Sequence, residues 1–298
     1  MKIALLTWWT WLEREVALMS ANTFNDNMDH EHDIFILPEE MGRFLGAYKD
    51  YDLALPVFHW EYWEDGTIFW LLDSIWLKYA FSPFAVHAIC MDKSKCNILV
   101  EKIWVKVPRS HLFRSKKEID SNKFSYPLIV KPNSWWSSVA TYKVNDFEEL
   151  EKAVENVISI TKDIVLVQEF ISGTEYSVPI IWNDALEALP IMRVELSAWE
   201  FFDYEEKYNS DWSNEVFWDI EEKLQNKLEN DSKKIHSFLG CRWISRIDFI
   251  VNESWVYFLE VNTIPGFSPA SIFPKAWKLT WRTLNQVVEK IIELWLEK

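Results

Sequence analysis

Glycine is scarce in this chain: only 6 of its 298 residues are glycine, whereas 19 are tryptophan. A globular chain of this length ordinarily has glycine at about 7% of its positions, or roughly 20 residues. The two counts together come to 25 residues, about 8% of the chain, which would be an ordinary share for glycine alone. The deficit of one residue type therefore matches the excess of the other.

Basic charge and long apolar runs are also lacking. Lys and Arg number 31 against 46 Asp and Glu, giving a net charge of −15, which argues against a nucleic-acid or anionic-membrane surface because such surfaces are basic. No apolar run reaches the ~18 residues of a membrane span. The N-terminus, Met1–Thr7, lacks the long apolar stretch and cleavage site of a signal peptide.

Cysteine is limited to Cys90, Cys96 and Cys241, an odd number in no paired metal-binding spacing. The simplest interpretation is a reduced, cytoplasmic protein that binds neither nucleic acid nor membrane. What the chain has instead is 49% hydrophobic and 26% charged residues, enough for a sizeable core.

Short apolar runs alternate with helical patterns in the first 85 or so residues. We predict strands over 2–7, 33–37 and 52–58, and helices over 12–24 and 67–76. This alternation is typical of a parallel sheet, so the fold class is α/β with an N-terminal doubly wound parallel-sheet domain. A helical segment over 83–103 connects it to the rest of the chain.

The remaining sequence predicts a mixture of strands and amphipathic helices. A helix is expected over 146–160, with Asp146 as its cap and Glu149 three residues on. Strands are expected over 127–131, 139–144, 164–168, 175–182 and 186–195. After a charged loop over 198–219 we expect a helix over 220–239, a hairpin of 244–251 with 256–261, and a last helix over 279–296.

The predicted C-terminal hairpin carries a group of polar side chains. Because side chains alternate along a strand, Glu260 and Asn262 share one face, as do Arg246 and Asp248. If the strands pair, two carboxylates and an amide meet beside an arginine, a set of hard oxygen donors that suits Mg²⁺. The alternative is a salt-bridged surface hairpin.

Three loops have the positions of phosphate or substrate loops but not their glycines. Lys131 ends an apolar strand and precedes the Ser-rich loop 132–138, which contains two adjacent tryptophans. Phosphate loops need glycine so that backbone N–H groups can approach the oxygens. Taken literally, the pair of indoles therefore favours an aromatic turn. The segments 7–16 and 59–66 show the same conflict after the first and third strands.

Together, in chain order, these motifs resemble the D-alanine–D-alanine ligase family of the ATP-grasp superfamily. The family's Gly-Gly-Thr-x-x-Glu-Arg-Glu-Val corresponds to 8–16, its His-Gly-x-x-Gly-Glu-Asp-Gly to 59–66, and its Lys-Pro-x-x-x-Gly-Ser-Ser to 131–138. Its Gly-Cys-x-Gly-x-x-Arg-x-Asp corresponds to 240–248, and its Glu-x-Asn-Thr-x-Pro-Gly is intact at 260–266. The departures place tryptophan at family glycines: Trp8, Trp9, Trp60, Trp63, Trp136 and Trp243.

The resemblance covers nearly the whole chain and implies a two-lobed ATP-grasp domain after the N-terminal one. It implies an N-terminal substrate domain over 1–88, a central lobe over 89–176, and a C-terminal lobe with the metal and catalytic site over 177–298. The implied reaction joins two D-alanines through a D-alanyl phosphate, with ATP consumed to ADP, for peptidoglycan precursor synthesis. ATP and two Mg²⁺ (or Mn²⁺) ions are implied, and a homodimer by analogy.

The resemblance also implies roles for residues of this chain. Arg246 and a backbone N–H near Gly266 would stabilise the tetrahedral intermediate, and Tyr208 favours a dipeptide product because ester-forming relatives tend to differ there. The implied catalytic residues are Glu13, Ser137, Tyr208, Arg246 and Gly266, and the implied substrate-binding residues are His59, Lys207 and Ser271. The implied ATP-binding residues are Lys93, Lys131, Ser138, Gln168, Glu169, Phe170, Ile171 and Glu175, and the metal ligands are Asp248, Glu260 and Asn262.

One hypothesis explains the departures: the gene comes from an organism that reads UGA as glycine, and it was translated as if UGA were tryptophan. The alternative is a deliberate glycine-to-tryptophan redesign. A residue with a Cβ at positive φ costs on the order of 1–2 kcal/mol, so several such sites together approach the ~5–15 kcal/mol stability of a domain. We therefore expect the chain with these tryptophans to be poorly stable or inactive.

Three other interpretations stay open at the level of sequence. The chain could be another ATP-grasp carboxylate–amine ligase, although Glu13, Tyr208 and Ser271 argue against a different amino-acid pair. It could be an aromatic-rich sugar-binding module, but that predicts a planar exposed row of tryptophans, whereas here they fall at turns and loop tips. It could also be an inactive relative in which tryptophan blocks nucleotide binding.

Overall fold

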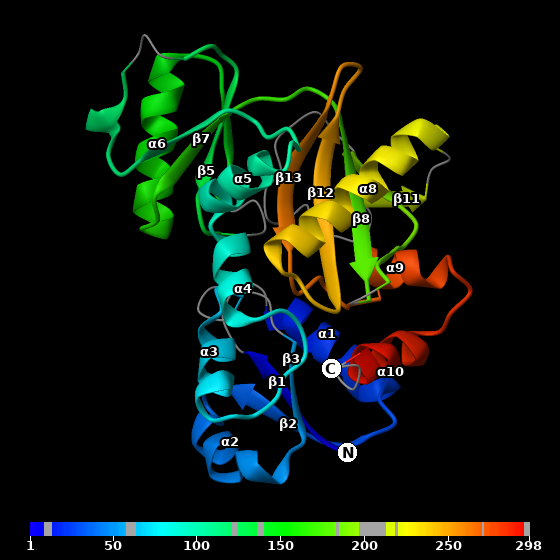
Figure 1. The fold of residues 1–298 in the computed structure, drawn as a ribbon. Helices are drawn as coiled ribbons and strands as arrows, with labels where there is room; N and C mark the ends of the chain where they lie inside the picture. The colour runs from blue at the N-terminus through cyan, green and yellow to red at the C-terminus, as the bar shows by residue number, and fades with distance from the viewer. Residues whose placement is uncertain are drawn as a thin grey trace.

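Three sheets make up the fold of this chain (Figure 1). The computed structural model describes residues 1–8, 14–57, 64–120, 124–135, 140–182, 185–196, 213–217, 220–269 and 271–294. The strand orders are β2-β1-β3, β4-β7-β5-β6 and β11-β10-β8-β12-β13, with β9 paired to β8. The first sheet is parallel and the other two are antiparallel, as in an α/β ATP-grasp architecture.

The N-terminal sheet confirms the predicted parallel unit. Its strands are β1 (Lys2–Trp8), β2 (Glu31–Leu37) and β3 (Leu53–Pro56), and β1 pairs in parallel with both neighbours. The central strand is buried on both faces, which explains its uninterrupted apolar run. The helices of this part are α1 (Arg14–Asn27), α2 (Met41–Ala47) and α3 (Thr67–Ser74), with the short 3₁₀ helix η1 (Tyr48–Asp50).

The connecting segment is helical, as predicted, and it consists of two helices. Helix α4 (Phe84–Met91) ends at Asp92, and α5 (Lys93–Lys102) begins at the next residue. Asp92 has extended backbone angles, and its carboxylate accepts a hydrogen bond from the Lys95 N–H at 3.0 Å. An aspartate cap of this kind starts a new helix. The apolar periodicity of the sequence therefore continues although the helix is interrupted at Asp92.

The middle sheet is covered by one long helix, as the sequence predicts. Its strands are β4 (Ser110–Phe113), β5 (Leu128–Pro132), β6 (Tyr142–Val144) and β7 (Val165–Glu169). Helix α6 (Phe147–Thr161) packs on β5, and the short η2 (Lys116–Glu118) lies near it. The predicted cap is confirmed: Asp146 Oδ1 accepts from the Glu149 N–H at 2.9 Å.

The largest sheet contains the predicted hairpin, and its other strands are more broken than expected. The hairpin is β12 (Ile244–Val251) with β13 (Val256–Asn262), next to β8 (Thr174–Ile181). The single strand expected over 186–195 is instead β9 (Glu187–Ala188) and β10 (Met192–Leu196). The expected charged loop contains an edge strand, β11 (Ser213–Phe217). Helix α8 (Glu222–Leu239) lies against this sheet, and no helix in the described ranges is long and apolar enough to cross a membrane.

The C-terminal end also corrects the prediction: two helices form here, one before the range 279–296 and one inside it that starts later than the helix expected there. They are α9 (Ile272–Lys278) and α10 (Leu284–Leu294), separated where Trp281 takes a positive φ of 62°. Helix α10 returns to the N-terminal part: Asn285 Nδ2 donates to the Asn27 carbonyl at 2.8 Å, and Glu289 accepts from the Asp29 N–H at 2.8 Å. The N-terminal sheet and α10 therefore share one hydrophobic core.

Tryptophan dominates the left-handed backbone positions. Eight non-glycine residues in the described ranges have positive φ, and five of them are tryptophan: Trp76, Trp104, Trp182, Trp243 and Trp281. This is the region of φ that glycine enters freely and other residues rarely.

Candidate active site

The inner face of the β12–β13 hairpin brings together the polar residues predicted to meet there. Asp248 lies directly opposite Glu260 in the register, and Arg246 lies opposite Asn262. Residues opposite one another in an antiparallel pair point to the same side of the sheet. The prediction that two carboxylates and an amide lie beside an arginine is confirmed.

Asp248 is buried and held by two side chains. Arg246 donates from Nε to Oδ1 at 3.0 Å and from Nη2 to Oδ2 at 2.8 Å. The hydroxyl of Ser177, on β8, donates to Oδ1 at 2.6 Å. A buried carboxylate needs such partners because an uncompensated charge away from water is costly.

Lys93 reaches the same face from the first residue of α5. Its Nζ lies 3.9 Å from Glu260 Oε2 and donates a hydrogen bond to the Trp135 carbonyl. The side chain is buried, and burial lowers the pKa of Lys93, while the charge of Glu260 acts in the opposite direction. A buried cation beside a carboxylate and a loop is suited to bind an anion that carries several negative oxygens.

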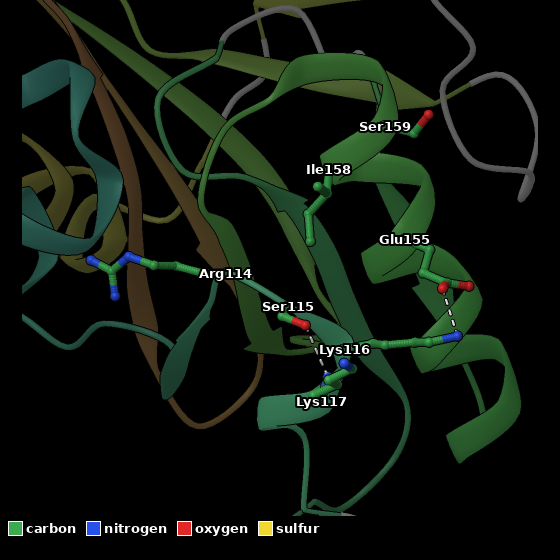
Figure 2. A pocket seen from close by; sticks show the side chains of 7 residues that line it. All are labelled: Arg114, Ser115, Lys116, Lys117, Glu155, Ile158 and Ser159. Atoms are coloured by element: carbon green, nitrogen blue, oxygen red, sulfur yellow. Dashed lines mark hydrogen bonds and ion pairs between the residues drawn. The ribbon is translucent and has the colours of Figure 1, made fainter.

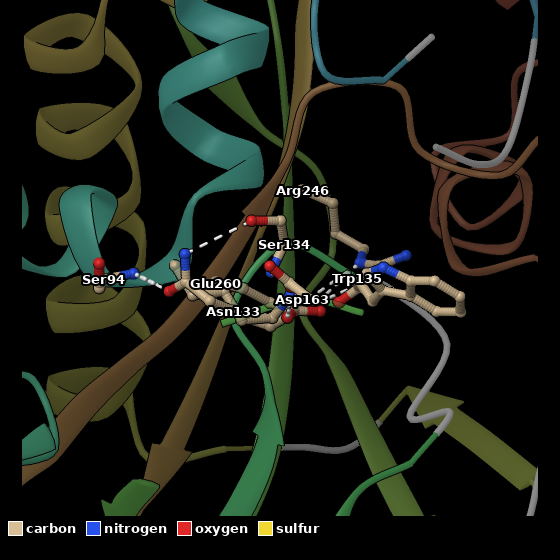
Figure 3. A network of polar contacts seen from close by, with 9 residues as sticks. Ser94, Asn133, Ser134, Trp135, Asp163, Arg246 and Glu260 are labelled. Carbon is tan, nitrogen blue, oxygen red and sulfur yellow. Dashed lines mark hydrogen bonds and ion pairs between the residues drawn. The ribbon is translucent and has the colours of Figure 1, made fainter. Parts of the chain in front are cut away.

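The loop after β5 is fixed to α5 by its backbone and by Asn133. The Ser94 N–H donates to Asn133 Oδ1 at 3.0 Å, and the Lys93 N–H donates to the Asn133 carbonyl at 3.1 Å. On the other side, the Ser134 N–H donates to Asp163 Oδ2 at 2.6 Å (Figure 3). Lys131, which lies on β5 two residues before Asn133, is also buried. The described part of the loop expected to hold a triphosphate, residues 132–135, is therefore anchored next to Lys93.

The residues expected to contact adenine form the crossing between two sheets. Gln168 and Glu169 end β7, and the segment from Phe170 to Gly173 leads directly into β8. A Cβ on Gly173 would lie 2.4 Å from the Val251 carbonyl oxygen, so this crossing requires glycine. Gln168 is buried, Ile171 and Glu175 are half-buried, and Lys143 Nζ lies 4.0 Å from the centre of the Phe170 ring.

The loop after β13 is tied to two other parts of the chain. The Phe267 N–H, next to Gly266, donates to Ser20 Oγ of α1 at 3.2 Å. Thr263 Oγ1 lies 2.7 Å from Nδ1 of the buried His87 on α4. Further on, Ser271 starts α9 and its hydroxyl pairs with that of Ser268 at 2.8 Å.

Six of the predicted site residues lie outside the described residues: Glu13, His59, Ser137, Ser138, Lys207 and Tyr208. Their roles stay predictions. Conversely, Ser177 contacts the site residue Asp248, although the sequence did not predict it as part of the site. The signal available is a serine in the buried part of a strand, directly before the apolar residues 178–181.

The hairpin fits a magnesium ion by its donor chemistry. No group of three His, Cys, Asp or Glu side chains in the described part is arranged to hold a metal. A cation here would be held by Asp248, Glu260 and the Asn262 amide oxygen, which also accepts from the Ile264 N–H at 3.0 Å. Mg²⁺ favours such a small oxygen set, completed by water and nucleotide phosphate.

The three cysteines form no disulfide. Cys90, Cys96 and Cys241 are all buried free thiols. The pKa of the Cys90 thiol is raised by its hydrogen bonds with Cys241 and Cys96 and by burial. The hydrogen bond with Cys241 has the largest effect. A buried protonated thiol is a weak nucleophile, so the cluster is structural.

An open pocket of about 490 Å³ lies on a different part of the middle sheet's unit, between η2 and α6 (Figure 2). It is lined by Arg114, Ser115, Lys116, Lys117, Glu155, Ile158 and Ser159. Lys116 already pairs with Glu155, and the residues of the hairpin face are not among its lining. The chemistry therefore belongs to the hairpin and α5 rather than to this pocket.

Two antiparallel sheets joined by a short crossing, with a buried lysine facing an acidic hairpin, define the chain as an ATP-grasp protein. The family described as "D-ala D-ala ligase C-terminus" matches residues 98–293. The chain is 30% identical to D-alanine–D-alanine ligase B of Clostridium perfringens, over 100% of this chain and 99% of the relative. It therefore belongs to the D-alanine–D-alanine ligase family.

Solved structures agree with this membership. The D-alanine–D-alanine ligase of Bacillus anthracis complexed with ATP superimposes with a TM-score of 0.87 at 27% identity, covering 100% of this chain and 98% of that one. The VanG D-Ala:D-Ser ligase of Enterococcus faecalis superimposes with a TM-score of 0.84 at 26% identity, covering 99% of each chain. These two relatives have different second substrates.

Proposed function

We propose that this chain is an ATP-dependent D-alanine–D-alanine ligase. The observation that carries the proposal is the single face on which Arg246, Asp248, Glu260 and Asn262 meet Lys93. In the family's reaction, a carboxylate oxygen of one D-alanine takes the γ-phosphoryl group of ATP, and ADP leaves. The amine of a second D-alanine then attacks the acyl carbon, and phosphate leaves as the peptide bond forms.

We assign the phosphates of ATP to the two lysines and the metal ions to the hairpin. Lys93 and Lys131 are placed to bind phosphate oxygens, since both are buried cations at the ends of elements that meet beside the anchored loop. Asp248, Glu260 and Asn262 would hold Mg²⁺ or Mn²⁺, two ions by family resemblance. The ions would neutralise phosphate charge during transfer.

Arg246 is proposed to stabilise the oxyanion of the tetrahedral intermediate. Nε and Nη2 of its guanidinium donate to Asp248. Because a guanidinium has five N–H donors, Arg246 can bind the reacting oxygen while it stays beside this carboxylate. A preorganised donor beside a developing negative charge is commonly the largest catalytic contribution. Gly266 would provide a backbone N–H to the same oxygen, and Ser271 would bind the carboxylate of the second substrate.

The proposal also includes the identity of the second substrate. One structural neighbour is a D-Ala:D-Ser ligase, and the residues that would select the amine, Lys207 and Tyr208, lie outside the described ranges. We propose D-alanine because Tyr208 favours a dipeptide product. The Mn²⁺ alternative, the homodimer, the cytoplasmic location and the domain limits at 88 and 176 belong to the same proposal.

The test is a product assay on the purified full chain with ATP, Mg²⁺ and D-alanine. With glycine at the six motif positions we expect equal amounts of ADP, phosphate and D-alanyl-D-alanine, with D-serine and a D-2-hydroxy acid as poorer second substrates. From the chain with tryptophan at these positions we expect little product. The same assay on a chain with glycine at Trp8, Trp9, Trp60, Trp63, Trp136 and Trp243 measures what the tryptophans cost. ATP turnover without dipeptide in both chains would reject the proposal.

A further inference from the structure

We propose that Ser177 is a positioning residue that holds the Asp248 carboxylate in place for the metal ion. This inference rests on the proposed function, because it concerns the cation that the hairpin would bind. Nothing in the family resemblance assigns Ser177 a role.

Ser177 and Asp248 are direct neighbours across two central strands. They are register partners in the antiparallel pairing of β8 with β12, so their side chains leave the sheet on the same side. Both are fully or almost fully buried, at 0% and 2% exposure. Strand β8 is flanked by β10 and β12 along this stretch, which fixes the serine backbone on both sides.

The hydroxyl of Ser177 has a charged acceptor at short range. Oγ donates to Asp248 Oδ1 at 2.6 Å, the length of a charge-assisted O–H···O⁻ bond, which is stronger than a neutral one. A serine in the apolar strand segment of Val178 and Ile180 would otherwise bury an unpaired hydroxyl at a cost. The pairing with Asp248 explains why a polar residue occurs there.

The two partners of Asp248 differ in how firmly they are held. Arg246 has a long side chain that is 19% exposed, and its donors also serve the proposed binding of the reacting oxygen. Ser177 has a short side chain on a central strand, so its hydroxyl is the partner of Asp248 with less freedom to move. Ser177 would therefore keep Oδ1 oriented while the carboxylate holds a cation. Partners behind a metal ligand commonly affect metal affinity or activity by about 10–100-fold.

The test compares Ser177→Ala with Ser177→Thr and a matched control, Ser232→Ala. Ser232 is also fully buried, but its hydroxyl has no partner among the described residues, so its loss removes the same atom without touching Asp248. Mn²⁺ binding in the presence of ADP is measured by electron paramagnetic resonance of the free ion. The midpoint of urea unfolding is measured for each variant.

We expect Ser177→Ala to weaken Mn²⁺ binding by about 10-fold or more, while Ser177→Thr and Ser232→Ala stay close to the parent chain. Equal Mn²⁺ affinity in Ser177→Ala and the parent would overturn the proposal, as would an equal loss in Ser232→Ala. A parent that binds Mn²⁺ and ADP but makes no dipeptide rejects the proposed function and leaves the Ser177 comparison intact. A parent that binds no Mn²⁺ overturns both.

A second inference comes from the backbone alone. We infer that Trp76, Trp104, Trp182 and Trp281 occupy positions of native glycine, in addition to the positions identified by motif. Trp76, Trp104 and Trp281 follow α3, α5 and α9, have φ of 59°, 64° and 62°, and are 92%, 91% and 97% exposed. Left-handed residues just after a helix are most often glycine.

The hydrogen bonds around Trp76 show that the backbone follows a regular helix ending. The Leu77 N–H donates to the Leu72 carbonyl at 3.0 Å, and the Trp76 N–H donates to the Asp73 carbonyl at 3.1 Å. An almost fully exposed indole gains little from packing that would offset the strain of positive φ. Peptide mass spectrometry of the protein from its native host is the test. We expect glycine masses at these four positions, and tryptophan masses there would overturn the inference.

Discussion

Lys93 Nζ lies 3.9 Å from Glu260 Oε2, which places the first residue of α5 against the face of β13 that we propose binds metal. The two residues are far apart in sequence and come from a connecting helix and a C-terminal hairpin. A phosphate group bound by Lys93 would therefore lie close to a cation held by Glu260.

Replacing Lys93 with methionine should weaken ATP binding while leaving the fold intact. Methionine keeps most of the buried stem but removes the charge, and a hydrogen bond to a charged group contributes about 1.5–3 kcal/mol, or roughly a 10–100-fold rise in the dissociation constant for ATP. Isothermal titration calorimetry measures this dissociation constant. Lys95→Met is the control, because Lys95 is exposed and pairs only with Asp92. Equal ATP affinity in both variants would contradict the placement of Lys93.

Replacing Glu260 with glutamine should make activity depend more strongly on Mg²⁺. The neutral amide keeps the shape but loses the charge that a divalent cation needs, so we expect the half-saturating Mg²⁺ concentration to rise by at least ~10-fold. Titration of ligase activity against free Mg²⁺, after removal of metal with a chelator, gives the value. An unchanged metal requirement would place the ion elsewhere. Glu253→Gln, on the exposed turn before β13, serves as the comparison.

Stability should fall steeply below pH 6.5 because two histidines are buried. Burial lowers the pKa of His87 from 6.5 to about 3 and that of His236 to about 4. Below pH 6.5 these histidines therefore take up protons in the unfolded chain but not in the folded one. Above that pH the two neutral histidines make their full contribution to the free energy of unfolding. As the pH falls, this contribution is lost by about 1.4 kcal/mol per pH unit for each histidine.

Urea unfolding at pH 7 and pH 5 tests this pH dependence. The two histidines together should lower the free energy of unfolding by roughly 3–4 kcal/mol over that interval. A His236→Asn variant should lose about half of the pH dependence, since the amide does not titrate in this range. Parallel pH profiles for the variant and the parent would assign the effect to other groups.

Replacing Trp104 with glycine should stabilise the chain. The residue has a φ of 64° and is almost fully exposed, so the change relieves the cost of a Cβ in left-handed backbone and loses little packing. We expect a gain of about 1 kcal/mol in the free energy of unfolding. Trp70→Gly is the matched control, because Trp70 is exposed but lies inside α3, where glycine costs about 1 kcal/mol. Changes of the same sign in both variants would refute the conformational explanation.

The sequence predicts best where local chemistry and burial agree. The Asp146 cap, the parallel N-terminal strands and the β12–β13 hairpin follow from capping residues, apolar runs and alternation. The failures have local causes as well. Strand β11 reads SNEVF, too polar to stand out from a charged loop, and it is recognisable as a strand only by its pairing with β10.

Local sequence patterns also predict some residues of the candidate site and not others. Arg246, Asp248, Glu260 and Asn262 are close in sequence on two paired strands, so alternation alone places them on one face. Lys93 was identified only through family resemblance, and Ser177 was missed, because each reaches the site through a contact between distant segments. Local periodicity contains no information about such contacts.

By itself, the sequence determined the family, the order of the motifs and the replacement of glycine by tryptophan, since these depend on residue identity along the chain. Only the tertiary structure decided which buried side chains hold Asp248 and which tryptophans have left-handed backbone. Both depend on packing between elements: the register of β8 against β12 places Ser177 behind the carboxylate, and the geometry after each helix fixes φ. Neither can be obtained from the order of residues without the fold.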